Sequence, residues 1–290
     1  MDYIDLNGDL VRNESSQDKL LKTLYGSQWG TAVLKVLTQK WISDLSGKLL
    51  DAGVSSLLIN SFIKNNKINM SDYERKKYHS FNDFFTRRIA YGRRPVGVAG
   101  MPDNGIVSPS DGKVTVYKID DELKLEVKGT VYTLEALLKN GKVAKHFKGG
   151  YVYIVRLSVD DYHRYIYPVS GVKTGNYHID GVYHTVNPVA NEHYAIYKEN
   201  TREYTLIRAK NRGYIVQMEV GALLVGRIVN HHDSRRVTCG EEKGYFEYGG
   251  STIVVMADRN MAEPRKDLLA HTADGYETKV LQGQMLSRLE

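Results

Sequence analysis

Short runs of β-branched and aromatic residues, separated by turn residues, recur through the middle and end of this 290-residue chain. The runs fall at 107–117, 125–131, 151–157, 181–186, 203–208, 214–220, 225–229 and 251–256. Short strands at close intervals are typical of sheets that close into a barrel or stack as a sandwich. We therefore predict a β-rich, barrel-like or sandwich-like domain. One helical turn, at 133–138 with Thr133 as its cap, interrupts the strands.

The segment before these strands has a helical pattern. Apolar residues recur at helical spacing between residues 19 and 67, and several glycines divide the pattern into short helices. Lysines and the only tryptophans, Trp29 and Trp41, lie in the same segment. Such helices suit either a membrane interface or ordinary packing on a protein core. We predict an α+β protein with an N-terminal helical, membrane-associating extension at 1–75 and a β-rich catalytic domain at 76–290.

A short helix with an apolar face is predicted at 80–88. Ser80 is suited to cap it, and the three phenylalanines at 81, 84 and 85 share one face. Arg87 and Arg88 follow at the end that the helix dipole makes favourable for cations. We interpret these arginines as a solvated helix end.

Composition limits the location and the partners. The single cysteine, Cys239, excludes an internal disulfide and fits a reducing compartment. The net charge of +6 favours an anionic surface such as a membrane leaflet, but it is too small to indicate nucleic acid. The start of the chain lacks the pattern of a secretory signal, and no apolar run is long enough to span a bilayer. We expect peripheral association with the cytoplasmic side of the cell membrane.

The residues that carry chemistry centre on Ser251. The pair Gly249-Gly250 precedes it and gives the backbone freedom beside the hydroxyl, which the attack of Ser251 on the Gly250 carbonyl would require. A turn or bulge in a hairpin explains the same glycines. Asp111, at a Pro-x-Asp-Gly bend, and His163 could meet Ser251 as orienter and base. His231 and His232 are interpreted as surface residues, with no metal site predicted.

The motifs, taken in order, resemble those of the phosphatidylserine decarboxylases, a pyruvoyl-dependent family. The resemblance runs from about residue 19 to about residue 258. The matching stretches are Phe-Phe-Thr-Arg at 84–87, Arg-Pro at 94–95, Ser-Pro-Ser-Asp-Gly at 108–112, Asp-Tyr-His-Arg at 161–164, Val-Asn at 186–187, Asn-Thr-Arg at 200–202, Val-Gly-Ala at 220–222, Val-Gly at 225–226 and the self-cleavage site at 243–252.

This resemblance implies a proenzyme that cleaves itself between Gly250 and Ser251 into a β chain, 1–250, and an α chain, 251–290. Ser251 would become a covalent pyruvoyl group, the built-in cofactor that takes up electrons when the serine headgroup loses carbon dioxide. The implied activity is conversion of phosphatidylserine to phosphatidylethanolamine at a membrane, and the implied assembly is a homodimer of cleaved chains.

Two departures from the family pattern bear on the site. Gly249 stands where many members have leucine, which leaves the Gly-Ser-Thr of the cleavage site intact. Many members also carry a second histidine, the one usually assigned to the Asp–His–Ser triad, where this chain has Ile166. We therefore predict His163 as the base, with His184 as the second candidate.

Two alternative functions follow from the same features. The missing second histidine is compatible with a membrane- or lipid-binding homologue that never matures. The same pyruvoyl chemistry could also act on a different amine, such as a free amino acid.

Overall fold

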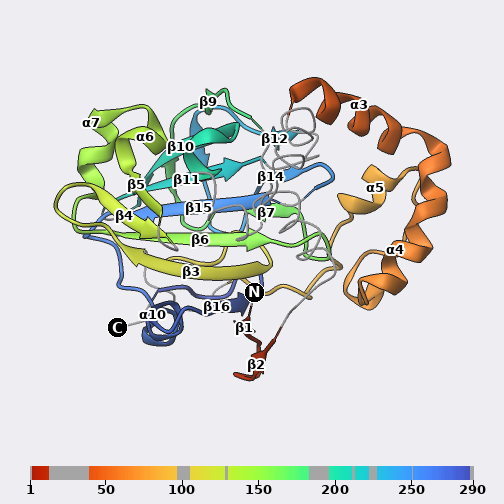
Figure 1. The fold of residues 1–290 in the computed structure, drawn as a ribbon, viewed down its shortest axis with the longest axis horizontal. Helices are drawn as coiled ribbons and strands as arrows, with labels where there is room; N and C mark the ends of the chain where they lie inside the picture. Colours follow the sequence, from red (N-terminus) through yellow and green to blue (C-terminus); the bar gives the residue numbers. More distant parts are fainter. Residues whose placement is uncertain are drawn as a thin grey trace, which may run out of the picture.

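The structure is a computed structural model that describes residues 2–12, 39–96, 105–127, 130–182, 196–210, 213–221, 227–249 and 251–287. A large sheet forms its centre (Figure 1). Its strands are β1 (Tyr3–Ile4), β2 (Leu10–Val11), β3 (Gly112–Lys118), β6 (Tyr151–Leu157), β8 (Gly171–Lys173), β9 (Tyr177–Ile179), β10 (Arg202–Ala209), β11 (Tyr214–Val220), β13 (Arg235–Val237), β15 (Ser251–Ala257) and β16 (Glu277–Val280). The order is β13-β8-β10-β11-β15-β6-β3-β16-β1-β2, and β9 pairs with β10.

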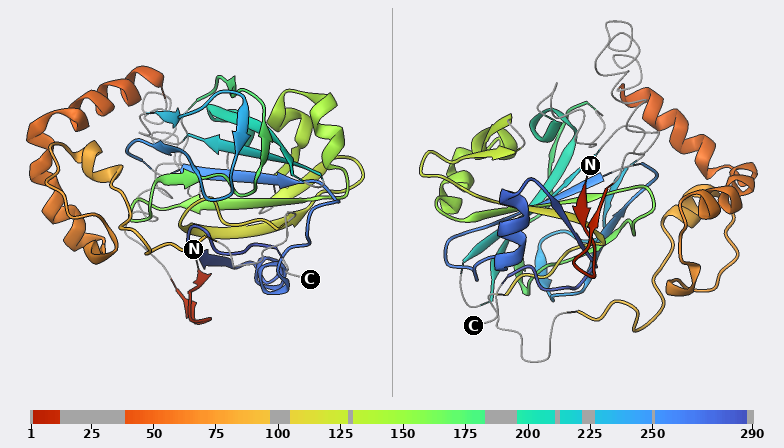
Figure 2. Two further views of the ribbon diagram at one scale, coloured as in Figure 1. Left: turned by 180° about the vertical axis from the view of Figure 1, so that it is seen from behind. Right: turned by 60° about the horizontal axis from the view of Figure 1, so that its bottom comes forward.

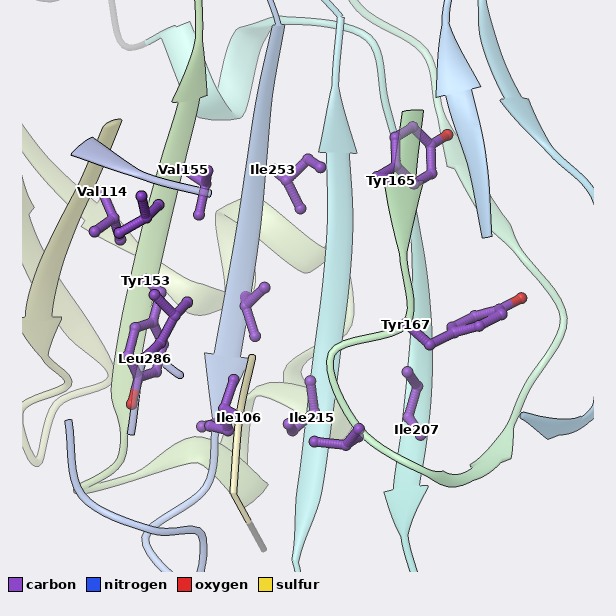
Figure 3. Packing of buried hydrophobic residues seen from close by; sticks show 14 of the residues in the cluster. Ile106, Val114, Tyr153, Val155, Tyr165, Tyr167, Ile207, Ile215, Ile253 and Leu286 are labelled. Atoms are coloured by element: carbon purple, nitrogen blue, oxygen red, sulfur yellow. The ribbon is translucent and has the colours of Figure 1, made fainter. Parts of the chain in front are cut away.

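A second, three-stranded sheet covers one face of the large one. It consists of β7 (Arg164–Ile166), β12 (Ile228–Asn230) and β14 (Glu242–Phe246), in the order β12-β14-β7. Alternation along the strands sends Val155, Ile253 and Ile215 from the large sheet toward Tyr165 and Phe246 from the small one, and all five lie in one buried cluster. Figure 3 shows side chains of this cluster between the layers.

The opposite face of the large sheet packs against a hairpin and short helices. These are β4 (Lys124–Val127), β5 (Thr130–Thr133), α6 (Leu134–Leu138), α7 (Gly141–Ala144), the 3₁₀ turn η3 (Lys145–Phe147) and α9 (Ile196–Glu199). Leu134, Leu137 and Phe147 bury against Val152 and Met256 there. Near the C-terminus, α10 (Lys266–Ala273) packs on β3 and β16.

Helices from the first third of the chain lie at one side of the sheets (Figures 1 and 2). They are α3 (Lys40–Asp51), η1 (Gly53–Leu58), α4 (Ile59–Asn65), η2 (Met70–Asp72) and α5 (Phe81–Phe85). Phe81, Phe84 and Phe85 form a separate cluster with residues of α3 and α4, and Tyr248 joins it from the β14–β15 turn. The helical region thus contacts the turn that leads to Ser251.

The α+β, β-rich architecture is confirmed, and the two stacked sheets have the predicted sandwich arrangement. The barrel-like alternative is wrong, because the large sheet remains open between β13 and β2 over the described residues. Thr133 accepts a hydrogen bond from the Ala136 amide and caps α6 as predicted. Within the predicted helical extension, residues 3–4 and 10–11 instead form the strands β1, which pairs with β16, and β2, which pairs with β1. The boundary at residue 75 stays a prediction.

Candidate active site

Ser251 is the first residue of β15 and lies fully inside the protein. Gly249, two residues earlier, has a φ of +131°, a conformation that favours glycine. Ser251 pairs with Leu157 on β6, and strand alternation places its side chain on the same face as Ile253, toward the small sheet. Its hydroxyl is buried and has no hydrogen-bond partner among the described residues. Gly250, the other half of the predicted cleavage site, lies outside the described residues.

His163 immediately precedes β7 in the small sheet. The Phe246 amide donates to its backbone carbonyl at 3.0 Å, and this bond fixes the histidine beside the end of β14. Its ring Nδ1 lies 3.0 Å from the Asp161 carbonyl. Because a carbonyl only accepts, Nδ1 carries the hydrogen and Nε2 keeps its lone pair. Nε2 is buried and has no hydrogen-bond partner in the described part of the chain.

The surroundings of His163 keep its ring neutral. Burial, followed by the positive charge of Arg87, lowers the pKa of His163 from 6.5 to about 3. The charge of Asp161 and then the backbones of Asp161 and Gly249 act in the opposite direction on this pKa, and the effect of Gly249 places the ring beside the turn before Ser251. The Phe85 ring packs against the imidazole with 4.1 Å between centroids. The site therefore contains a dry, neutral imidazole whose lone pair is available to take a proton.

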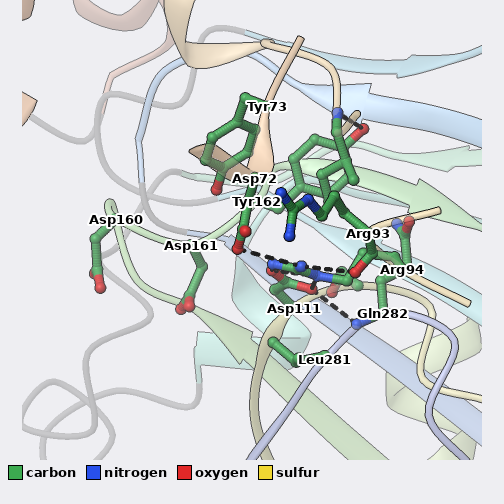
Figure 4. Close-up of polar contacts among 12 residues, drawn as sticks. Asp72, Tyr73, Arg93, Arg94, Asp111, Asp160, Asp161, Tyr162, Leu281 and Gln282 are labelled. Atoms are coloured by element: carbon green, nitrogen blue, oxygen red, sulfur yellow. Dashed lines mark hydrogen bonds and ion pairs between the residues drawn. The ribbon is translucent and has the colours of Figure 1, made fainter. Parts of the chain in front are cut away.

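Asp111 has other partners than His163. Arg94 donates to its carboxylate from Nε at 2.9 Å and from Nη2 at 2.7 Å, and the Gln282 amide donates at 2.8 Å (Figure 4). Two of the sequence motifs, Arg94-Pro95 and the Pro-x-Asp-Gly bend, meet in this ion pair. The structure does not bring Asp111 into hydrogen-bond contact with His163, so the Asp–His–Ser triad stays a prediction.

Asp161 positions His163 through its backbone, while lysines hold its side chain. Lys279 donates to the buried carboxylate, Lys113 lies 3.7 Å from it, and the Ser158 amide donates at 2.8 Å. The lysine charges outweigh the effect of burial and hold the pKa of Asp161 well below its usual range. The loop that presents the Asp161 carbonyl to His163 is thereby fixed.

The expectation of a solvated helix end is wrong for Arg87. Its side chain is only 2% exposed, whereas Arg88 is 56% exposed at the side chain. Nη2 of Arg87 donates to the Asp160 carbonyl at 3.2 Å and reaches the Asp161 carbonyl at 3.4 Å. Arg87 and His163 thus share the Asp161 carbonyl as an acceptor. The Phe-Phe-x-Arg spacing was the available sequence signal, but it does not reveal burial.

Comparison with known proteins identifies the family. The phosphatidylserine decarboxylase family model matches residues 81–286. The phosphatidylserine decarboxylase proenzyme 2 of Clostridium acetobutylicum is 40% identical over 92% of this chain and 90% of its own length. The proenzymes of Clostridium tetani and Fusobacterium nucleatum are 37% and 35% identical, over 94% and 96% of this chain and 93% of each relative. The chain belongs to the phosphatidylserine decarboxylase family.

Residues of other family motifs form buried contacts that hold the elements of the fold together. Arg202 is fully buried and donates to the carbonyls of Leu137, Ala136, Lys198 and Asn200, which ties β10 to α6 and α9. Lys243 and Glu219 form a buried ion pair at 2.6 Å between the two sheets. Burial lowers the pKa of Lys243 and raises that of Glu219.

The remaining candidate residues lie apart from this site or outside the described ranges. His184 lies outside the described residues. Ile166 is buried in β7, where its carbonyl accepts from the Gln217 side chain at 3.2 Å. His231 pairs with Glu242 at 2.8 Å. The described residues contain no cluster of potential metal ligands.

Proposed function

We propose that this protein is a phosphatidylserine decarboxylase that matures by cleaving itself between Gly250 and Ser251. One observation carries the proposal: the Ser251 hydroxyl and His163 Nε2 are both buried and have no hydrogen-bond partner among the described residues, whereas buried polar groups in folded proteins are usually bonded. These are the two atoms that a serine nucleophile and its base must offer. Family membership supplies the substrate and does not favour the non-maturing alternative.

The cleavage is a rearrangement within the chain, followed by elimination. His163 Nε2 takes the hydroxyl proton as the Ser251 oxygen bonds to the Gly250 carbonyl carbon. The bond from that carbon to the Ser251 nitrogen then breaks as the nitrogen receives the proton from His163, which leaves an ester and a free amine. Loss of the Ser251 α-proton then expels the Gly250 carboxylate. Water hydrolyses the resulting enamine through its imine form and releases ammonia, which leaves a pyruvoyl group at residue 251.

The residues around Ser251 fit a pyruvoyl group. When formed, it supplies a carbonyl that accepts the substrate amine and takes up the electron pair left by carbon dioxide. Phe85 packs against the His163 ring, and both Phe85 and Phe246 are fully buried, so the surroundings of His163 are apolar, which favours loss of a carboxylate as a neutral gas. His163, held by the Asp161 carbonyl, is placed to hold and return a proton on this face of the sheet.

Intact mass and activity together test this function. The wild type should separate under denaturing conditions into 1–250 and a 251–290 fragment whose first residue is pyruvoyl, and it should release carbon dioxide from phosphatidylserine vesicles. Ser251→Ala should remain a single full-length chain without activity. A wild type that stays full-length yet decarboxylates, or Ser251→Ala that still cleaves, would contradict the proposal. Labelled free serine, assayed in parallel, separates the lipid from an amino-acid substrate.

The helical side of the molecule is the proposed membrane-docking surface. Leu45 and Leu49 on α3, with Val54, Leu57 and Leu58 on η1, are large apolar side chains left exposed, and Leu57 is 78% exposed. Exposed apolar side chains gathered on neighbouring helices are typical of interfacial binding. Among the described residues, no helix is both long and apolar enough to cross a bilayer. We propose peripheral association with the cytoplasmic leaflet.

Vesicle co-flotation tests this surface. Leu57→Asp with Leu58→Asp should lower binding to phosphatidylserine vesicles at least tenfold while self-cleavage continues. Val131→Asp, at an apolar position on β5 that is as exposed as Leu58 and lies at the other end of the molecule, should bind as the wild type does. Equal binding by both variants would place the docking surface elsewhere.

Sedimentation of the cleaved protein tests the proposed homodimer.

A further inference from the structure

Arg87 is a buried cation with unused hydrogen-bond donors. Its Nε and Nη1 are buried and have no acceptor among the described residues, although its Nη2 reaches three oxygens. No carboxylate pairs with it in the described part of the chain. The other deeply placed arginines there are satisfied: Arg156 pairs with Glu277 at 2.5 Å, and Arg202 donates to four carbonyls. A buried guanidinium without a counter-ion is costly unless a ligand supplies one.

Aromatic rings cover this guanidinium but do not satisfy it. The Arg87 Cζ lies 4.3 Å from the centre of the Tyr73 ring and 4.9 Å from that of Phe84. Such contacts stabilise the charge from the ring faces and give no acceptor to Nε and Nη1. They also hold the side chain in one orientation, so the guanidinium is preorganised for binding a ligand.

Arg87 is one of the residues that line a pocket of about 220 Å³. Arg87 lines it together with Arg88, Arg164 and Lys76, while Glu74 and Asp83 are its acidic lining residues. Lys76 pairs with Asp83 at 2.6 Å, and Arg164 pairs with Glu242 at 2.8 Å. Arg87 is therefore the most deeply buried of the lining cations, and its Nε and Nη1, which have no acceptor among the described residues, lie beneath the pocket surface.

The same guanidinium lies next to the proposed base. Arg87 and His163 contact one carbonyl, that of Asp161, and the charge of Arg87 acts on the histidine. A ligand held by Arg87 would therefore have its neighbouring atoms close to His163. In phosphatidylserine, the phosphorus is separated from the reacting α-carbon by one ester oxygen and one methylene carbon.

We propose that Arg87 binds the phosphodiester of the substrate headgroup and so sets the enzyme's preference for a phosphorylated serine over serine itself. This inference rests on the proposed function and names the recognition element of the same site. The substrate carboxylate is the other anion that Arg87 could hold. Holding it would stabilise the charge that must be lost as carbon dioxide and would oppose the reaction, whereas the phosphodiester charge is unchanged throughout.

Short-chain phosphatidylserine and the product headgroup, glycerophosphoethanolamine, provide the test. For Arg87→Met, we expect normal cleavage to 1–250 and 251–290, a KM for short-chain phosphatidylserine raised about tenfold or more, and a kcat within about threefold of wild type. Glycerophosphoethanolamine should inhibit the wild type competitively and the variant at least tenfold less well. Inorganic phosphate, tested beside it, shows whether free phosphate shares the site. As a control, Arg235→Met removes a half-exposed cation on β13, outside the lining of the pocket, and should change KM less than threefold.

Each alternative result has a defined meaning. Unchanged KM and inhibition in cleaved Arg87→Met, or a fall in kcat alone, would overturn the proposal while leaving the decarboxylase function intact. Absence of competitive inhibition of the wild type by glycerophosphoethanolamine would overturn it as well. If Arg87→Met does not fold, Arg87→Lys decides the question, because lysine keeps the charge but lacks the planar donors and should still raise KM several-fold. A protein that never cleaves contradicts the proposed function instead.

Discussion

Acid should destabilise this protein through His163 by an amount that the structure specifies. The pKa of His163 is lowered from 6.5 to about 3. At a pH between these two values, His163 is protonated in the unfolded chain and neutral in the folded protein. Stability from this group is fully present above about pH 6.5 and falls as pH decreases toward 3. At pH 5 the free energy of unfolding should be lower by about 2 kcal/mol. This follows because pH 5 is about 1.5 units below the pKa of histidine in the unfolded chain, and each unit corresponds to about 1.4 kcal/mol.

The measurement compares Ser251→Ala with Ser251→Ala/His163→Gln, so that both proteins remain uncleaved. Urea unfolding at pH 7.5, 6 and 5 gives the difference in unfolding free energy at each pH. From pH 7.5 to 5 this difference should move by about 2 kcal/mol in favour of the glutamine variant, which has no ring to protonate. The same substitution at the half-exposed His178 controls for loss of an imidazole as such.

Parallel pH dependences for the two proteins, within about 0.5 kcal/mol, would refute the reasoning. They would mean that the ring of His163 is solvated in the folded protein, and its role as a dry base would then lose its support. The same argument gives a kinetic expectation for the wild type. Its self-cleavage rate should lack an inflection near pH 6.5, because the base stays unprotonated there.

Three further predictions concern residues around the site. Arg94→Gln leaves the nearly buried Asp111 carboxylate without its cation and should cost about 3 kcal/mol in urea unfolding. Lys243→Met should cost a similar amount by isolating Glu219, and adding Glu219→Leu should recover part of it, which a double-mutant cycle measures. Gly249→Ala should slow self-cleavage on a denaturing gel, because φ of +131° strains an L-residue; Gly275→Ala, with a φ of +83° far along the chain, should cleave normally.

Strand positions were predictable because each strand carries its own signal. The runs at 151–157 and 214–220 coincide with β6 and β11, and Ser251 begins β15 as the Gly-Gly pair suggested. The open sheet was not predictable. Closure depends on which strands become edges, and the edge at β16 is occupied by β1 and β2 from the start of the chain. Two-residue strands have no periodicity from which they could be recognised.

The burial of Arg87 illustrates why the site was harder to predict than the sheets. At the end of a short helix, an arginine ordinarily projects into solvent, and the dipole argument for residues 87 and 88 is the same for both. Their difference arises from Tyr73 and from the loop at Asp160 and Asp161, which enclose only the first of them. The contacts with Asp160 and Asp161 join positions more than seventy residues apart, and such contacts leave no trace in local spacing.

The partners of Asp111 and His163 separate two roles that the triad hypothesis combined. An aspartate that orients a histidine must accept from its Nδ1–H, but here the Asp161 carbonyl accepts that bond and the Asp111 carboxylate is held by Arg94. A carbonyl fixes the tautomer as a carboxylate would, but it adds no full negative charge beside the ring. Burial and the charge of Arg87 keep the imidazole neutral, and the charge of Asp161 opposes them only in part. A backbone carbonyl is present at every position of any sequence, so motif spacing alone would always favour the carboxylate as the orienting group.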